Sequence, residues 1–332
     1  MGGGGAGVTG PAEGHDVTGP AEGRDVTGPA ERSDAVRDVG HERLRVVVDH
    51  PDRDGPAVLF SNGMGLILDY WDPVVQRLPG WVCVRFDRPG LGGSPPQTAT
   101  AAVVEAEVDR LVAVADEVIA GRPLVLVGHS LGAIFAQLAA RLHPDRAVGL
   151  VLVDPTDPTE HASDDDAASF VGRTLKAATQ VPRLASVAGG AIERAVTFAA
   201  TIRPDGPRLT TGQRRLQASP HHLAAVIEES ARSGRLCQQC LELEERVTMP
   251  DIPIRVVVGA RAGRLLTFRN ETWVRRSKDR MPAYGPSARM AVYRSAHLMM
   301  LDVPDLLAED INDVATAARP DAEDCSQREA DD

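Results

Sequence analysis

The chain has 332 residues, of which 43% are hydrophobic and 25% are charged, so most of it is expected to fold as a globular protein. Its net charge of -11 argues against nucleic acid or an anionic membrane as the main partner. Four cysteines in a chain of this length do not make a disulfide framework, and a reducing compartment is expected.

The N-terminal region contains a nine-residue repeat. Its three copies run from residue 8 to residue 34 and read VTGPAEGHD, VTGPAEGRD and VTGPAERSD. Each copy has one valine, and its Gly and Pro disfavour both helix and strand. We therefore expect residues 1–41 to form a disordered tail, and the acidic residues 319–332 to form a second tail. No signal peptide or bilayer-spanning run is visible, so a soluble, cytoplasmic protein is expected.

From residue 44 onward, short apolar runs alternate with amphipathic segments. The runs predict strands at residues 44–50, 57–63, 81–90, 123–130 and 147–156, and the segments between them predict helices at residues 100–121 and 131–144. Because the strands are continuously apolar, they are expected to form a mostly parallel sheet covered by helices on both faces. Ligands of such α/β sheets bind at the carboxyl ends of the strands.

This alternation stops between residues 157 and 248, where Pro and Gly interrupt several helical patterns. We expect this segment to be a helical cap over the sheet. A strand at residues 252–259, a helix at 271–281, a strand at 288–297 and a helix at 303–318 follow. The predicted core therefore consists of residues 42–156 and 249–318.

The most informative motif is GHSLG, residues 128–132, which stands between a predicted strand and a predicted helix. A serine on such a sharp turn has a strained backbone, and small residues two positions away on either side permit the turn. The amino end of the following helix favours negative charge beside the serine hydroxyl. The motif therefore predicts Ser130 as a nucleophile.

Over residues 44–318 the sequence resembles the α/β-hydrolase superfamily. Besides GHSLG, FSNGMG resembles the family's oxyanion loop with Asn62 in place of the usual histidine, FDRPGLGGS resembles its D-x-P-G-x-G-x-S turn, and SAHLMMLDVPDLLAEDI resembles its histidine loop and final helix. The resemblance implies that His297 is the general base and that the backbone N–H groups of Met64 and Leu131 stabilise the oxyanion. Asp87 and Arg88 are expected to stabilise the D-x-P-G turn.

The third member of the catalytic group is less obvious. The loop after the strand at 252–259, which often holds the acid in this family, reads ARA at residues 260–262. Some relatives, including certain haloalkane dehalogenases, take the acid from the end of the preceding strand, where this chain has Asp154. We therefore prefer Asp154. The alternatives are another carboxylate, namely Asp157, Glu271 or Asp279, or no acid at all.

Other candidate sites are interpreted as structural. Cys237 and Cys240 form a single C-x-x-C pair, and a zinc site would need two further ligands. The acidic run at residues 164–166 is expected to be solvated, and His221 and His222 are expected on the surface of the cap. No G-x-G-x-x-G motif opens the first strand–helix turn, so no dinucleotide is predicted. No other cofactor and no metal is predicted either.

The function that these patterns favour is a cofactor-free serine hydrolase of carboxylic esters or related acyl compounds. A serine nucleophile disfavours dehalogenase and epoxide-hydrolase chemistry, which use an aspartate in this family. The apolar residues of the cap indicate a small, partly apolar acyl substrate. An acyltransferase or lyase at the same site is one alternative, and a non-catalytic small-molecule-binding protein is another. The sequence indicates no oligomeric state.

Overall fold

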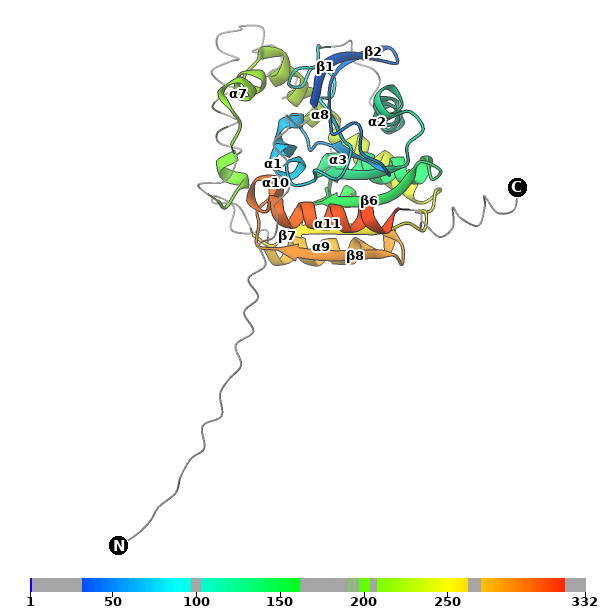
Figure 1. The fold of residues 1–332 in the computed structure, drawn as a ribbon, viewed down its shortest axis with the longest axis vertical. Helices are drawn as coiled ribbons and strands as arrows, with labels where there is room; N and C mark the ends of the chain where they lie inside the picture. Colours follow the sequence, from blue (N-terminus) through cyan, green and yellow to red (C-terminus); the bar gives the residue numbers. More distant parts are fainter. Residues whose placement is uncertain are drawn as a thin grey trace, which may run out of the picture. The chain divides into compact units, whose positions relative to one another are not determined.

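A computed structural model of the chain describes residues 1, 32–96, 103–161, 191, 194, 197–203, 208–261 and 270–319 (Figure 1). The strands are β1 (Arg32–Val39), β2 (Glu42–Asp49), β3 (Ala57–Ser61), β4 (Cys83–Phe86), β5 (Leu124–His129), β6 (Ala147–Val153), β7 (Ile254–Gly259) and β8 (Ala288–Tyr293). The α-helices are α1 (Asp72–Val75), α2 (Val104–Ile119), α3 (Leu131–Leu142), α4 (Pro158–His161), α7 (Thr211–Gln217), α8 (Pro220–Glu244), α9 (Asn270–Arg280), α10 (Met299–Asp302) and α11 (Pro304–Ala317). Two 3-10 helices, η1 (Leu68–Trp71) and η2 (Met281–Tyr284), complete the described elements.

The described strands form one sheet in the order β1-β2-β4-β3-β5-β6-β7-β8. The pairs from β4 to β8 are parallel, and β1 and β2 join as antiparallel strands at one edge. In the register of β5 and β6, His129 lies opposite Val153, so the two residues that follow reach the same edge of the sheet. The predicted α/β class with a mostly parallel sheet is confirmed.

Helices cover both faces of the sheet because its strands are apolar on both sides. In β5, Leu124 and Leu126 contact the core that includes α2 and α3, whereas Val125 and Val127 contact the core that includes α1 and α11. This period of two is the geometry of a strand buried on both faces. Figure 1 shows α11 lying along β6 and β7.

The first strand corrects the predicted tail boundary. Residues 32–39 were assigned to the disordered tail, but they form β1, which pairs with β2 along its whole length. The sequence signal is weak because β1 is an edge strand with mostly exposed side chains, so it lacks a hydrophobic run. A turn at Gly40, whose φ is 59°, returns the chain into β2. The other residues of the predicted tail, apart from Met1 and residues 40–41, lie outside the described residues.

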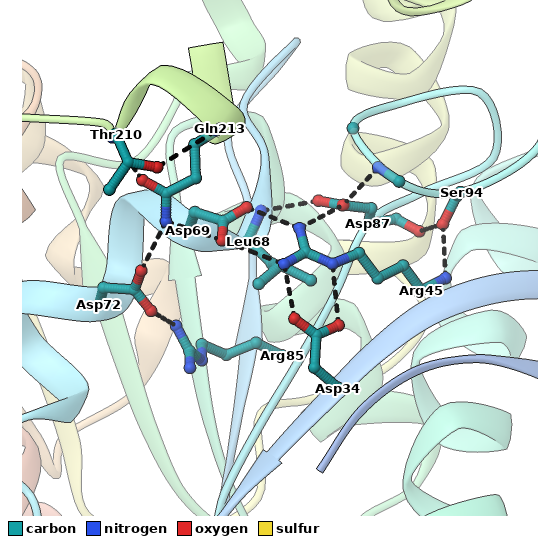
Figure 2. A network of polar contacts seen from close by, with 12 residues as sticks. Asp34, Arg45, Leu68, Asp69, Asp72, Arg85, Asp87, Ser94, Thr210 and Gln213 are labelled. Carbon is teal, nitrogen blue, oxygen red and sulfur yellow. Dashed lines mark hydrogen bonds and ion pairs between the residues drawn. The ribbon is translucent and has the colours of Figure 1, made fainter. Parts of the chain in front are cut away.

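A partly buried arginine joins this edge to the rest of the fold (Figure 2). Arg45 of β2 forms a two-point contact with Asp34 of β1, at 3.0 and 2.8 Å, and its Nη1 lies 2.7 Å from Asp69 Oδ2. The same nitrogen lies 3.4 Å from Asp87, whose pKa is raised by burial to about 6. Gln213 of α7 donates to both Asp69 and Asp72, so part of the insertion is tied to the same network (Figure 2).

The described part of the predicted cap comprises α4, α7 and α8. The first half of α8 faces the loops that follow β3 and β4, through four residues spaced as one helical stripe: His222, Ala225, Val226 and Glu229. The second half packs on α3 through Leu236, Cys237 and Cys240, which are buried. The sequence predicted His222 on the surface of the cap, but the residue is buried. Its Nδ1 accepts the Gly92 N–H at 3.1 Å, which places the ring against the loop after β4.

The cap as a domain, with bounds 157 and 248, stays a prediction, and the acidic run at 164–166 lies outside the described residues. Residues 320–332 of the predicted C-terminal tail also lie outside them, while residue 319 is described. Within the described ranges, no helix combines the length and the apolar character needed to cross a membrane.

Candidate active site

The candidate site lies where β5 passes into α3. Ser130 occupies the junction with φ 51° and ψ -120°, a backbone conformation that non-glycine residues rarely adopt. Its N–H is bonded to Val153 O of β6 at 3.1 Å, which holds the turn against the neighbouring strand. Its hydroxyl lies 3.4 Å from the hydroxyl of Thr156, in the segment that follows β6.

Both glycines of GHSLG are needed for close backbone packing. A Cβ on Gly128 would lie 2.5 Å from Ala133 Cα, and a Cβ on Gly132 would overlap the Ser61 carbonyl oxygen. Neither neighbour is a flexible side chain that could move aside. The glycines therefore allow α3 to begin directly behind β5 and beside the loop after β3, which is the arrangement that exposes the serine.

The structure brings Ser130, His297 and Asp154 into one hydrogen-bonded chain. His297 lies between β8 and α10, with Nε2 3.0 Å from Ser130 Oγ and Nδ1 2.5 Å from Asp154 Oδ2. Asp154 directly follows β6, and its N–H is bonded to Val257 O of β7 at 2.7 Å. Each ring nitrogen of His297 therefore has one partner: Nδ1 contacts the carboxylate and Nε2 contacts the hydroxyl.

Asp154 is buried, and its other carboxylate oxygen is also bonded. Oδ1 accepts the Gly259 N–H at 3.1 Å and the Trp273 indole N–H at 2.8 Å. Burial raises the pKa of this carboxyl, but the hydrogen bond and charge of His297, together with these two N–H donors, outweigh burial and hold the pKa below its usual value. The group is therefore an ionised acceptor at neutral pH, oriented from both sides.

The other candidate acids lie elsewhere. Asp157 accepts hydrogen bonds from the backbone N–H and the hydroxyl of Thr159, at 3.0 and 2.7 Å, so it binds the start of α4. Glu271 and Asp279 are exposed residues of α9. Ala262, in the loop after β7, lies outside the described residues.

His129 contacts both the ring and the backbone of His297. Its ring is buried, with the ring centroid 4.7 Å from that of His297, and its Nε2 lies 2.9 Å from the His297 carbonyl oxygen. Only a protonated Nε2 can donate to a carbonyl, which assigns the proton of the neutral ring to this nitrogen. Burial, followed by the nearby charge of His297, lowers the pKa of His129 to about 3, so the ring stays neutral.

The loop after β3 lies against the nucleophile. A Cβ on Gly63 would stand 3.2 Å from Ser130 Cβ and 2.6 Å from His129 Nδ1, so this backbone approaches the elbow as closely as glycine permits. Met64 follows, with its side chain 42% exposed. Leu131 is the first residue of α3, where N–H groups have no acceptor within the helix. The two N–H groups predicted as oxyanion donors thus belong to segments on either side of Ser130.

Three residues that support this arrangement were not singled out from the sequence. Trp273 bonds Asp154, Glu229 of α8 bonds the loop after β3, and Asp302 accepts the Ala296 N–H at 3.0 Å beside His297. The sequence places Trp273 and Glu229 in helical segments, and their partners lie more than a hundred residues away, so no local pattern marks them. Asp302 lies in the predicted histidine loop, six residues from its partner.

Across the residues whose positions the structure describes, no group of three or more His, Cys, Asp or Glu could hold a metal ion. Cys237 and Cys240 are free and buried between α8 and α3. The absence of a cofactor stays a prediction.

Comparison with known proteins shows similarity to α/β hydrolases and shows the fold. A family model described as the alpha/beta hydrolase fold matches residues 56–189. A Variovorax paradoxus (strain S110) protein named as carbamate hydrolase RutD is 31% identical over 117 residues, which cover 34% of this chain and 44% of that protein. Lipase LipV of Mycobacterium tuberculosis (strain ATCC 25618 / H37Rv) is 34% identical over 115 residues, 33% of this chain and 43% of LipV. The matches therefore span less than half the length of these relatives.

Solved structures resemble the chain over a greater length. ALR0039 of Nostoc sp. PCC 7120, described as an α/β hydrolase, has a TM-score of 0.63 and 17% identity, and the alignment covers 86% of this chain and 98% of that one. A loop variant of haloalkane dehalogenase DbeA from Bradyrhizobium elkanii has a TM-score of 0.58 and 15% identity, over 90% of this chain and 100% of that one. At such identities the likeness shows the fold.

The sheet and the elbow define an α/β protein with a serine at the carboxyl edge of its parallel strands. Together with the family-model match over residues 56–189, they show that the chain has the α/β-hydrolase fold.

Proposed function

We propose that the protein is a serine hydrolase that cleaves carboxylic esters or related acyl compounds through an acyl-enzyme on Ser130, without a cofactor. The observation that carries the proposal is the hydrogen-bonded chain from Ser130 Oγ through the His297 ring to Asp154 Oδ2. A serine hydroxyl is a weak nucleophile at neutral pH, and a base within hydrogen-bonding distance removes this obstacle.

In the proposed reaction, Ser130 Oγ attacks the substrate carbonyl carbon while its proton passes to His297 Nε2. The carbonyl oxygen becomes an oxyanion, for which the Met64 and Leu131 N–H groups are the proposed donors. Collapse of the tetrahedral intermediate expels the alcohol, which takes the proton from His297. Water then attacks the acyl-enzyme with His297 again as base, and the acid and free Ser130 are released.

Asp154 has a supporting role in this scheme. By accepting the Nδ1 proton it holds the tautomer in which Nε2 faces the serine, and its negative charge stabilises the imidazolium that forms during each step. Because His297 and the two N–H donors lower its pKa in spite of burial, the carboxylate keeps this charge at neutral pH. A carboxylate on His297 also favours turnover over the alternative of a binding protein that has lost catalysis.

The relatives support hydrolysis, since they are named carbamate hydrolase and lipase. The exposed Met64, which follows the glycine that lies against Ser130, favours an apolar acyl group. The acyl chain length that the site prefers is the property that the esters below compare.

The test uses a fluorophosphonate probe and p-nitrophenyl esters of increasing acyl length. We expect the native chain to be labelled at Ser130 and to hydrolyse short esters. Ser130→Ala should abolish labelling and turnover together while the melting temperature is retained. Ser233→Ala is the matched control, because this serine on α8 bonds only the Ser230 carbonyl among the contacts described.

Labelling of Ser130→Ala at another active-site residue would overturn the assignment of the nucleophile. A native chain that is neither labelled nor active on any ester would favour the binding-protein alternative. Transfer of the acyl group to an added alcohol in preference to water would favour an acyltransferase.

A further inference from the structure

A second buried cluster lies on the other side of the loop after β3. Arg88, which follows β4, donates from Nη1 to Asn62 O at 2.6 Å and from Nη2 to Gly63 O at 2.9 Å. Its side chain is only 4% exposed, so two carbonyl groups of the loop are bonded by a buried cation. The sequence had indicated only that Arg88 stabilises its own turn.

The cap helix completes this cluster through Glu229. Its Oε1 lies 2.6 Å from Arg88 Nε, and its Oε2 lies 2.9 Å from both Arg88 Nη2 and the Gly65 N–H. The Glu229 side chain is 14% exposed. One carboxylate of α8 therefore binds the arginine and the loop together.

The position of α8 makes these contacts specific. A Cβ on Gly65, where φ is 67°, would lie 2.9 Å from Val226 Cγ2, so the helix is already in close contact with the loop. Val226 and Glu229 stand three residues apart and share one face of α8. The loop is thus enclosed between the nucleophile elbow, Arg88 and the cap helix.

Peptide geometry connects these contacts to catalysis. In a trans peptide the C=O and the following N–H point in opposite directions. The Gly63 carbonyl points to Arg88 and also accepts the Leu66 N–H at 3.2 Å, so the Met64 N–H points away from Arg88. A Cβ on Gly63 would lie 3.2 Å from Ser130 Cβ, so the peptide that carries the Met64 N–H lies beside the nucleophile.

We propose that Glu229 is a positioning residue that, through Arg88 and Gly65, sets the direction of the Met64 N–H toward the oxyanion, so that the cap helix takes part in transition-state stabilisation. This inference rests on the proposed serine-hydrolase function. It adds to that function a requirement for the cap that is separate from substrate binding.

The first test compares Glu229→Ala with a matched variant on the same helix. Glu244 of α8 binds Arg280 Nη2 with both oxygens at 2.7 Å, and its side chain is 8% exposed, so Glu244→Ala also breaks a buried ion pair. Fifteen residues of helix place it about 22 Å from Glu229. Active enzyme is counted by fluorophosphonate labelling, so that loss of folded protein does not count as loss of rate.

We expect Glu229→Ala to lower kcat for p-nitrophenyl butyrate about ten- to a hundredfold, a part of the effect of losing one oxyanion donor. KM should change less than about threefold, because the N–H acts mainly on the transition state. Glu244→Ala should leave kcat within about twofold. Inhibition by butylboronic acid, which forms a tetrahedral adduct on the serine, should weaken by the same factor as kcat falls.

Glu229→Gln is the conservative variant, and it carries the test if Glu229→Ala does not fold. Its amide oxygen can still accept the Gly65 N–H, although the charge for Arg88 is lost, so kcat should recover at least about threefold relative to alanine. A rise in KM with unchanged kcat, or equal kcat losses in Glu229→Ala and Glu244→Ala, would overturn the inference. Absence of labelling and turnover in the native chain would instead overturn the proposed function.

Discussion

Two residues at the carboxyl edge of the sheet, Ser130 and Asp154, have positive φ angles of 51° and 42°. Each such conformation costs about 1–3 kcal/mol in a non-glycine residue and persists only where neighbouring contacts hold it. Both residues are bonded by their N–H groups to the adjacent strand, at 3.1 Å for Ser130 and 2.7 Å for Asp154. The sheet therefore holds two strained residues at the ends of neighbouring strands, on either side of the His297 ring.

The role of Asp154 can be tested with an isosteric change. Asp154→Asn should lower kcat by about two to four decades, because an amide favours the wrong imidazole tautomer and the corresponding change in a serine protease costs about 10⁴-fold. The measurement is ester hydrolysis per labelled active site. Asp157→Asn is the control, since Asp157 bonds Thr159 instead of the histidine. Nearly full activity of Asp154→Asn would refute its assignment as the acid.

Trp273 provides a second residue-scale prediction. Trp273→Phe removes the indole donor to Asp154 Oδ1 but leaves the Gly259 N–H in place. Loss of one hydrogen bond to a charged group is worth about 1.5 kcal/mol, so kcat should fall about tenfold. Trp81→Phe loses a similar hydrogen bond, to Asn312 Oδ1 at 3.1 Å, away from the site. If Trp273→Phe and Trp81→Phe both keep the kcat of the native chain, the indole hydrogen bond to Asp154 has no role in catalysis.

At the scale of elements, β1 and α8 show how contacts distant in sequence decide the structure. β1 has mostly exposed side chains, and it is held by the backbone ladder to β2 and by Asp34 on Arg45. The stripe of α8 packs against loops more than a hundred residues earlier in the chain, as in the contact of Glu229 with Gly65. Its sequence alone predicts a helix but not the surface that the helix covers.

Truncation at β1 separates the strand from the repeats. Deletion of residues 1–31 should leave the melting temperature nearly unchanged, because every described contact of β1 is retained. Deletion of residues 1–40 removes β1 and one of the carboxylates around Arg45, and should lower stability by about 1–3 kcal/mol, the cost of leaving a buried charge partly unpaired. Thermal or urea unfolding measures both. Equal melting temperatures would mean that β1 contributes nothing to stability.

At the scale of the whole molecule, two buried histidines make folding sensitive to acid. Burial lowers the pKa of His129 to about 3 and that of His222 to about 4, from an ordinary value of 6.5. Between these values and 6.5 the unfolded chain binds protons that the folded chain does not, so the free energy of unfolding falls as pH decreases. The slope is about 1.4 kcal/mol per pH unit for each histidine.

His222→Asn tests this linkage. The amide oxygen can accept the Gly92 N–H in place of Nδ1, but it does not titrate in this range. The variant should therefore lose stability less steeply than the native chain between pH 6 and about pH 4, as urea unfolding at each pH would report. His41→Asn, at an exposed position, is the control. Identical slopes for His222→Asn and the native chain would contradict the prediction.

The sequence by itself determined the features that depend on neighbouring residues. Continuous apolar runs predicted strands β2 to β8 in a mostly parallel sheet, and the fold class is confirmed. GHSLG predicted the elbow because its two glycines lie only two residues from the serine on either side. These signals are local, so one sequence is enough to read them.

Only the tertiary structure decided which side chains meet across the sheet edge. His297 and Asp154 are 143 residues apart, and their contact depends on β6 lying beside β7 and β7 beside β8. The same holds for the indole of Trp273 on Asp154 and for Glu229 on the loop after β3. Each arises from strand order and helix packing. The energy of such a contact does not depend on the separation of its residues along the chain, so periodicity does not identify the partners. His297 and Asp154 were named only through the resemblance to the α/β-hydrolase superfamily.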